Sequence, residues 1–390
     1  MKQKIKTGLF LAACVVCVSV LWRHTHLKFE PKQDKTDHTQ AAKDEKTQAP
    51  EFPATYKENV SKHLSFDATV DTGNADVGRI GCRTATMQKF EEESLKKSFL
   101  DPDVSYDVSK SRETDWEETD VVSTSYEKES VGLLRVWKTG FRYSKIPLMM
   151  DVSDLMSTAY GLKGINYQYQ FSKDTELEGF LRQDAWEKAS EIIQQQGINQ
   201  GQWKLAESYT LDAASMNRQE KKLISEGSID LKKENGHGKW RRKEEGYFFF
   251  IEECVDGLPL VPAKTLTDMG NSWGYPTNQI VYVTRDGIAG LHISNWFEVG
   301  EDAGYYTLAA FHDIVEALES KYENQLTKEC VCIEKMKLYL YPISRGKGSF
   351  QLYPVWICTA RMRMSEKDKI GREERIALDA VTGEELEELQ

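Results

Sequence analysis

The feature that most constrains this chain is a continuous apolar run at residues 7–22, close to its first residue. Lys2, Lys4 and Lys6 precede the run. A basic stretch followed by an apolar core is typical of an export signal or a signal-anchor. We therefore expect the run to lie in the cell membrane and the bulk of the chain to be extracytoplasmic.

Three alternatives are open for the apolar run: a lipoprotein signal, an uncleaved signal-anchor, or a buried helix. Residues 11–14 (Leu-Ala-Ala-Cys) have the pattern of a bacterial lipobox, which predicts lipidation at Cys14. Only about five apolar residues precede Cys14, fewer than the roughly 7–15 of a signal-peptide core. An uncleaved single-pass helix is also short, since a span needs about 20 apolar residues. We favour the signal-anchor over the lipoprotein, and both over a buried helix of a cytosolic protein.

The charge of the chain excludes one class of partner. The sequence has 62 acidic and 51 basic residues, which gives a formal net charge of −11. Nucleic acids and anionic surfaces attract basic patches, so we predict no nucleic-acid partner.

The cysteines leave two alternatives open. Two of the seven lie in the apolar run, and the remaining five cannot all pair internally. Cys332 and Cys358 come roughly opposite each other if the chain reverses around residues 345–348, which allows a disulfide. Buried free thiols are the alternative that we favour, because spacing alone does not establish disulfide geometry. Beyond the apolar run the sequence has no Cys-x-x-Cys motif, and His237, His292 and His312 are isolated, so we predict no metal site and no cofactor.

Composition divides the chain into five segments. Residues 1–22 hold the anchor, and the polar, aliphatic-poor residues 23–58 predict a disordered spacer. Residues 59–175 are predicted to form an N-terminal α+β domain. Two helix-plus-meander modules are expected to follow, at residues 176–300 and 301–390.

The modules rest on a pattern that occurs twice. Apolar residues at helical spacing predict helices over residues 181–196 and 307–322. Strand-like stretches follow each helix, including residues 203–211 and 247–255 after the first. We therefore predict an α+β fold of antiparallel β-meander sheets, each covered by a helix, built from tandem helix-plus-hairpin modules.

Local signals set further expectations. Residues 256–257 and 286–287 are both Asp-Gly between apolar runs, which predicts two hairpins with type I′ turns. Residues 131–146 predict one long strand. Residues 103–130 are polar and acidic, so we expect a long loop or an irregular edge there.

Four short stretches carry a resemblance to known families. They are residues 246–250 (Gly-Tyr-Phe-Phe-Phe), 255–259 (Val-Asp-Gly-Leu-Pro), 283–288 (Val-Thr-Arg-Asp-Gly-Ile) and 377–384 (Ala-Leu-Asp-Ala-Val-Thr-Gly-Glu). Together they resemble uncharacterised membrane-tethered or lipoprotein families of Gram-positive bacteria with PepSY-like modules. In plan the chain is also similar to YycH/YycI-type regulators. The resemblance implies an extracytoplasmic regulatory role and identifies no catalytic residues.

Aromatic residues are the main candidates for ligand contact. They are Trp273, Tyr275, Trp296 and Phe297, in or beside predicted loops. Exposed rings there would stack on a sugar or grip a peptide, whereas buried rings would close the end of a sheet. Aromatic side chains are more often buried in a core than exposed as a binding surface, but the sequence leaves both alternatives open.

These observations predict a membrane-tethered, non-enzymatic binding or regulatory protein of the cell envelope, with a protein or peptide partner. A surface protein that binds cell-wall glycan or polymer is the alternative. An unrecognised hydrolase is a third, because a catalytic site can assemble from scattered residues. No linear motif in the sequence marks a catalytic residue.

Overall fold

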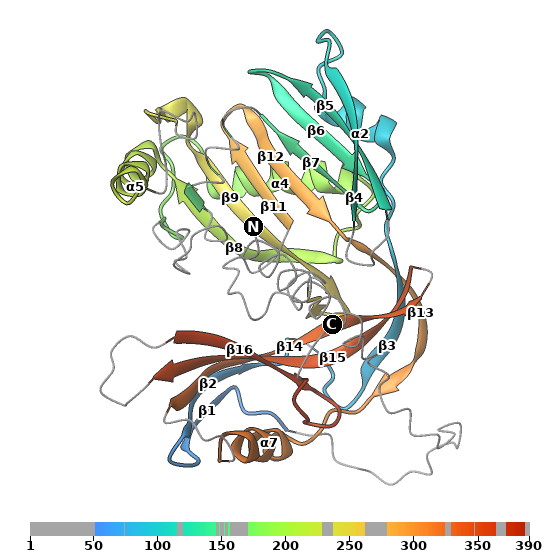
Figure 1. Ribbon diagram of the computed structural model, residues 1–390, viewed down its shortest axis with the longest axis vertical. Coiled ribbons are helices and arrows are strands. Elements are labelled where there is room, and N and C mark those ends of the chain that lie inside the picture. The colour runs from blue at the N-terminus through green and yellow to red at the C-terminus, as the bar shows by residue number, and fades with distance from the viewer. Residues whose placement is uncertain are drawn as a thin grey trace, which may run out of the picture. The chain divides into compact units, whose positions relative to one another are not determined.

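The computed structural model describes residues 51–73, 75–114, 120–145, 148, 152, 155–156, 171–227, 237–261, 279–323, 329–346, 348–363 and 372–386. They belong to one compact unit, Ala49–Leu389. As predicted, the fold is α+β, and within the described residues the strands form two mostly antiparallel sheets (Figure 1).

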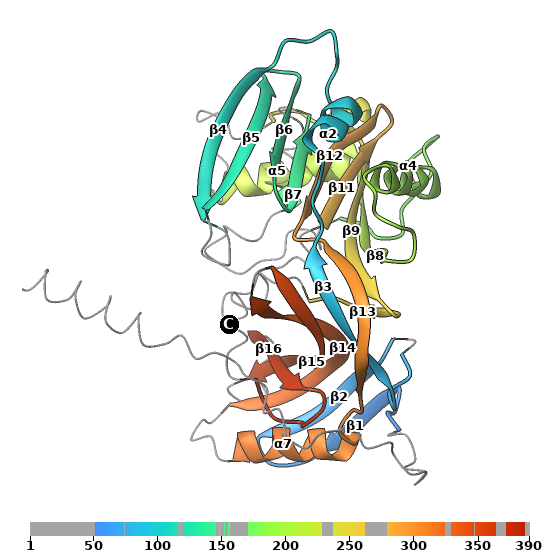
Figure 2. The same ribbon diagram turned by 90° about the vertical axis from the view of Figure 1, so that its right-hand side faces the viewer.

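The first sheet has seven strands within the described residues. In spatial order they are β1 (Thr55–Asn59), β2 (Leu64–Asp71), β14 (Cys330–Gly346), β15 (Ser349–Arg363), β3 (Ile80–Met87) and β13 (Phe297–Tyr306), with β16 (Arg372–Asp379) paired to β15. The pair β2–β14 is parallel, and it joins early and late parts of the chain in one sheet. Figure 2 shows β3 and β13 side by side. The helix α7 (Phe311–Glu323) contacts β2.

The second sheet has nine strands within the described residues. In spatial order they are β10 (Leu258–Pro259), β9 (Gly246–Val255), β11 (Gln279–Thr284), β12 (Gly287–Ser294), β7 (Gly140–Ser144), β6 (Gly132–Trp137), β5 (Asp120–Lys128) and β4 (Asp107–Thr114), with β8 (Trp203–Leu211) paired to β9. Further helical elements in the described part of the chain include α2 (Glu92–Phe99), α4 (Arg182–Gln195), α5 (Ala213–Ser225) and the 3₁₀ turn η3 (Arg242–Glu244).

Strand β9 is the centre of the second sheet's core, and all ten of its residues are buried. Successive side chains of a strand point to opposite faces. Tyr247 and Phe249 pack in one cluster with residues of α4, whereas Phe248 and Phe250 pack in another with residues of α5. Because both faces are covered, the sequence of β9 is a nearly continuous apolar run rather than an alternating one.

The two predicted helices are confirmed as α4 and α7, and β8 has the predicted bounds. Two local predictions are wrong. Residues 131–146 form the two strands β6 and β7, because the chain reverses between Trp137 and Gly140. Residues 103–130 contain the regular pair β4–β5, although their composition is polar.

The sheets do not follow the predicted domain boundaries. Strands β2 and β3 of the segment 59–175 lie in the first sheet, whereas β4 to β7 of the same segment lie in the second. Strand β13 crosses the predicted boundary at residue 300. The predicted tandem arrangement is therefore corrected: each sheet combines a helix-plus-strand unit with strands from the N-terminal segment. Strand β1 begins at Thr55 and pairs with β2, so the prediction of a disordered spacer is wrong for residues 55–58.

The two Asp-Gly turns differ from each other. Asp256 and Gly257 have φ of 50° and 85°, the two positive angles that a type I′ turn requires. At the second hairpin the φ of Gly287 is 104°, and Asp286 is not among the residues with positive φ. Thr284 pairs with Gly287, so Arg285 and Asp286 form the turn. The hairpin prediction is confirmed at both places, and the type I′ prediction at the first.

Candidate functional site

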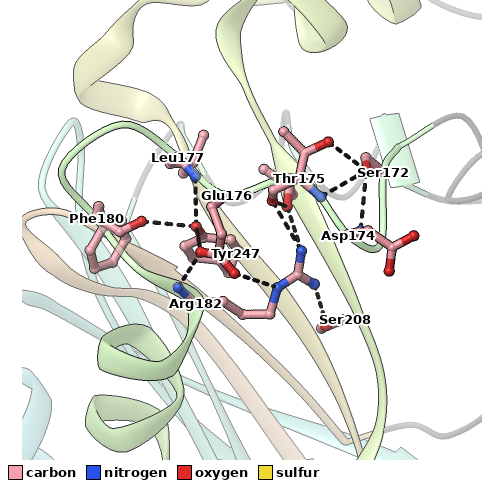
Figure 3. Close-up of polar contacts among 10 residues, drawn as sticks. Ser172, Asp174, Thr175, Glu176, Leu177, Phe180, Arg182, Ser208 and Tyr247 are labelled. Atoms are coloured by element: carbon pink, nitrogen blue, oxygen red, sulfur yellow. Dashed lines mark hydrogen bonds and ion pairs between the residues drawn. The ribbon is translucent and has the colours of Figure 1, made fainter.

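A polar cluster of several hydrogen bonds surrounds Arg182, the first residue of α4 (Figure 3). Its Nη1 donates to Ser208 Oγ at 2.5 Å, and its Nη2 donates to Thr210 Oγ1 at 2.9 Å. Nη2 also donates to the Thr175 carbonyl oxygen at 3.1 Å, and Nε lies 3.6 Å from Glu176 Oε1. The guanidinium group therefore joins the loop before α4 to strand β8.

The phenol of Tyr247 on β9 completes this cluster. Its hydroxyl oxygen accepts a hydrogen bond from the Leu177 amide at 2.8 Å. Two acceptors lie within reach of its proton: Glu176 Oε2 at 2.7 Å and the Phe180 carbonyl oxygen at 2.8 Å. Figure 3 shows these groups converging on the ring's hydroxyl. We call Arg182, Glu176, Tyr247 and their partners the Arg182–Tyr247 network.

The protonation states in this network follow from its surroundings. Burial raises the pKa of Tyr247 to about 12, and its hydrogen bond to Glu176 adds to the effect. Burial also raises the pKa of Glu176, but hydrogen bonds from Tyr247 and Arg182 outweigh it and leave that pKa lowered. At neutral pH the tyrosine is therefore a neutral donor and the glutamate an anion. The network stabilises the loop and does not supply a general base from Tyr247.

Two further arginines hold the same loop. Arg285 Nη2 donates to the carbonyl oxygen of Glu178 at 2.6 Å, and the Arg285 guanidinium lies 3.8 Å from Glu245 Oε2. Arg242 Nη2 lies 3.1 Å from Glu178 Oε2. No local sequence motif marks this network, because its members lie at distant positions in the sequence.

A second polar cluster lies at the end of β9, where residues of the two sheets meet. Glu252 has a side chain only 6% exposed, and Lys337 Nζ of β14 donates to both of its carboxylate oxygens at 3.0 and 3.1 Å. Lys204 Nζ of β8 lies 3.7 Å from the same carboxylate. This ion pair links the second sheet to the first.

The neighbouring Glu253 has a different environment. Its Oε1 accepts a hydrogen bond from the backbone amide of Phe297 at 2.8 Å. Burial raises the pKa of Glu253 well above its ordinary value, and the Phe297 amide offsets only part of that rise. The two glutamates point to opposite faces of β9, so they do not form an acid–base couple.

The structure corrects one proposed role for the aromatic candidates. Trp296 is fully buried and belongs to the core cluster that includes α4. Phe297 is 2% exposed and packs edge-on against Phe350, with 5.1 Å between ring centroids. These two rings are core residues that close the sheets, so they do not form an exposed stacking platform. Trp273, Tyr275 and Cys14 lie outside the described residues.

The disulfide alternative is also corrected. Cys332 pairs in register with Arg361, whereas Cys358 pairs with Met336, four residues farther along β14. Both cysteines are free. Burial raises the pKa of the Cys358 thiol to about 12, so that thiol is protonated and unreactive at neutral pH.

One side-chain group of metal-ligating type occurs among the described residues. His312, Asp313 and Glu316 of α7 are exposed and have ligand atoms within 4.8 Å of one another. Exposed acidic groups on one helical turn are common surface features, so we assign this group no function. None of the helices in the described part of the chain is both long and apolar enough to span a membrane, and residues 7–22 were not among those described.

Comparison with known proteins bears on the fold alone. The chain is similar to a crystal structure of an uncharacterized protein from Eubacterium rectale, with a TM-score of 0.58 and 17% sequence identity over 85% of this chain and 93% of that one. The C-terminal domain of Bacillus megaterium YpeB aligns with a TM-score of 0.30 and 12% identity over 78% of this chain and 99% of that one, a similarity too low for structural argument. No protein-family model and no curated protein matches the sequence. The first similarity shows a shared fold, which does not by itself determine function.

Proposed function

We propose that this protein is a membrane-tethered, non-enzymatic binding or regulatory protein of the cell envelope, with its folded unit outside the cytoplasm. The observation that carries the proposal is the apolar run at residues 7–22 behind three lysines, followed by a polar spacer. An uncleaved signal-anchor is the form of attachment that we propose. The resemblance to families with PepSY-like modules stays a prediction and agrees with this role.

The geometry of the described residues supports a binding role. The Arg182–Tyr247 network directs its charged and polar groups to the protein's own loop and strands. Tyr247 remains protonated, and Glu252 is engaged by Lys337. These groups are therefore engaged in holding the fold together, which fits a binding or regulatory role better than a catalytic one. In this proposal the protein modulates envelope signalling or proteolysis through a protein or peptide partner.

Protease treatment of intact cells tests the location. The part of the polar spacer that precedes the folded unit, at residues 23–50, is the expected site of cleavage, because loosely packed segments are cut more readily than folded ones. We expect external protease to release a fragment that begins within the spacer and contains the folded unit, while a cytoplasmic marker protein stays intact. Recovery of the uncleaved chain in the cytosol, with cleavage seen only after lysis, would overturn the proposal.

A further inference from the structure

Helix α5 and the segment 237–245 carry a basic surface. Their exposed basic side chains are those of Arg218, Lys221, Lys222, Lys239, Arg241, Arg242 and Lys243, which we call the α5 basic surface. One acidic residue, Glu226 at the end of α5, is exposed beside them. Residues 228–236, which connect the two elements and lie outside the described residues, add two acidic and two basic residues and so no net charge. The net charge of the whole chain, −11, gives no sign of this local excess.

Hydrogen bonds join the two elements into one surface. Asn217 Nδ2 of α5 donates to the carbonyl oxygen of Trp240 at 3.0 Å, and the Trp240 amide donates to Asn217 Oδ1 at 3.1 Å. Glu220 Oε1 of α5 accepts from the amides of His237 and Gly238 at 2.5 and 3.1 Å. The segment is therefore fixed along the helix, and the basic residues of both elements keep constant positions.

The basic residues of α5 lie on its outer face. Met216 and Leu223 are buried and pack in the core cluster that covers one face of β9. Arg218, Lys221 and Lys222 are exposed, and their spacing of three and four residues places them on one side of the helix. The helix thus turns an apolar face to the sheet and a cationic face to solvent.

Most carboxylates of these elements point inward and bind backbone amides. Glu220 is 3% exposed, and both amides that it accepts from belong to the 237–245 segment. Glu244 Oε2 accepts from the Arg241 amide at 2.7 Å, and Glu245 Oε1 accepts from the Ala213 amide at 3.1 Å. The acidic groups are therefore engaged in folding, whereas the cations remain at the surface.

Few of the cations are neutralised by ion pairs. Arg242 Nη2 lies 3.1 Å from Glu178 Oε2, but both side chains are more than half exposed, so the pair is weak. Lys243 Nζ lies 4.0 Å from Glu244 Oε1. Within the described residues no carboxylate pairs with the other three lysines, which are Lys221, Lys222 and Lys239.

We propose that the α5 basic surface docks onto the anionic phospholipid headgroups of the membrane that anchors the chain. The inference rests on the proposed function and adds to it a second, electrostatic membrane contact made by the folded unit. Clusters of lysine and arginine on a helix are attracted to anionic bilayers, by about fivefold in the docking equilibrium for each basic residue. Docking would hold the folded unit in one orientation on the bilayer.

The composition of the surface favours lipid over a protein partner. Four of its seven basic residues are lysines, whose flexible stems suit mobile headgroups, whereas protein interfaces are poor in lysine and rich in exposed aromatic rings. The aromatic residue of the segment, Trp240, is 2% exposed. A second copy of this surface would bring like charges together, which is unfavourable.

The proposed tether keeps the membrane within reach. A disordered spacer over residues 23–50 would span about 30 Å root-mean-square. Tethering at that range makes docking an intramolecular step at a high effective concentration, so a modest electrostatic attraction is sufficient.

The test uses the full chain in lipid nanodiscs, with a fluorescent amino acid at the exposed Ser225 as donor and a headgroup-labelled lipid as acceptor. We expect more energy transfer in discs that contain phosphatidylglycerol than in discs of phosphatidylcholine alone. Salt at 1 M should remove the difference, because it shortens the screening length to about 3 Å.

Charge variants test the assignment to α5. The double variant Lys221→Gln with Lys222→Gln should lower the docked-to-undocked ratio by about fivefold for each lysine. The matched control, Lys97→Gln with Lys128→Gln, removes two exposed lysines elsewhere and should leave energy transfer unchanged.

The outcomes separate this inference from the proposed function. Insertion into both kinds of disc with equal energy transfer, or an equal effect of the two double variants, would overturn the inference and leave the anchor standing. Association with anionic discs alone would support the inference and overturn the anchor, and association with neither would overturn both. In cells, a photoreactive residue at Ser225 that crosslinks to one protein in place of lipid would overturn the choice of lipid.

Discussion

At the scale of residues, the most informative contrast is between Glu252 and Glu253. They are adjacent in the sequence, yet Glu252 is paired with a lysine of the first sheet, whereas Glu253 meets a backbone amide in a buried site. The sequence predicts that their side chains point to opposite faces of a strand, and their different partners agree with this. It did not predict which of them is ion-paired, because Lys337 comes from a distant strand.

Glu253→Gln should stabilise the protein at neutral and alkaline pH. The folded protein holds the Glu253 proton above the pH at which the unfolded chain releases it, since burial raises the folded-state pKa. Wild-type stability therefore falls as pH rises from about 4.3 towards that raised pKa, and glutamine removes this dependence. We expect a gain of about 1–3 kcal/mol in the free energy of unfolding at pH 8, and almost none at pH 4.

Urea denaturation at the two pH values measures this difference. The control is Glu252→Gln, which leaves Lys337 buried beside an uncharged group and should destabilise the protein at pH 8. A Glu253→Gln variant with the same pH dependence as wild type would show that Glu253 is not held protonated.

Tyr247→Phe should weaken the loop before α4. The substitution removes the hydroxyl that accepts from the Leu177 amide and contacts Glu176. Losing these bonds should cost about 1–3 kcal/mol, and hydrogen exchange should accelerate at residues 171–181. Tyr305→Phe is the control, because Tyr305 is 52% exposed and its loss should change stability little. Unchanged exchange in the loop would mean that Arg182 and the other arginines hold it without Tyr247.

At the scale of elements, turn chemistry explains why hairpin positions were predictable. Asp-Gly pairs mark both reversals, since glycine adopts positive φ at little steric cost. The motif at residues 379–384 is also structural. The Asp379 carboxylate accepts from the amides of Val381 and Thr382 and from the Tyr353 hydroxyl, which fixes the turn after β16. Its conformation follows from local hydrogen bonding.

Gly257→Ala and Gly287→Ala should each destabilise their hairpins by about 1–2 kcal/mol, because φ is 85° at the first and 104° at the second. Ser130→Gly is the matched control, because it introduces a glycine at a turn position where the other two variants remove one. Ser130 already has a φ of 61°, so glycine there should cost no stability. Thermal unfolding of the three variants measures these effects. If Gly257→Ala is as stable as wild type, the positive φ at residue 257 does not strain an alanine there and the prediction is wrong.

At the scale of the whole molecule, the sheets are assembled from distant parts of the chain. The parallel pair β2–β14 and the ion pair between Glu252 and Lys337 both depend on residues that are remote in sequence. The predicted modules are therefore not expected to fold independently. A cut at residue 175 or 300 would divide strands that share a sheet or interrupt β13 itself.

Deletion of residues 1–22 should leave the stability of the folded unit unchanged and change its location. In our proposal the leader serves as an anchor, so its removal takes away no core contact. We expect an unfolding temperature within error of the full chain in detergent, and loss of membrane association in cell fractionation. A truncated protein that unfolds or aggregates would indicate that the leader packs within the globular unit.

The sequence by itself determined the positions of α4, α7 and β8, the α+β class and the reversals at glycine, because these depend on periodicity and local backbone preferences. It left open whether Trp296 is exposed and whether Cys332 and Cys358 form a disulfide, and it assigned β4–β5 to a loop or irregular edge. Only the tertiary structure decided those points. Burial and strand register are set by partners far away in the chain, and no local pattern specifies them.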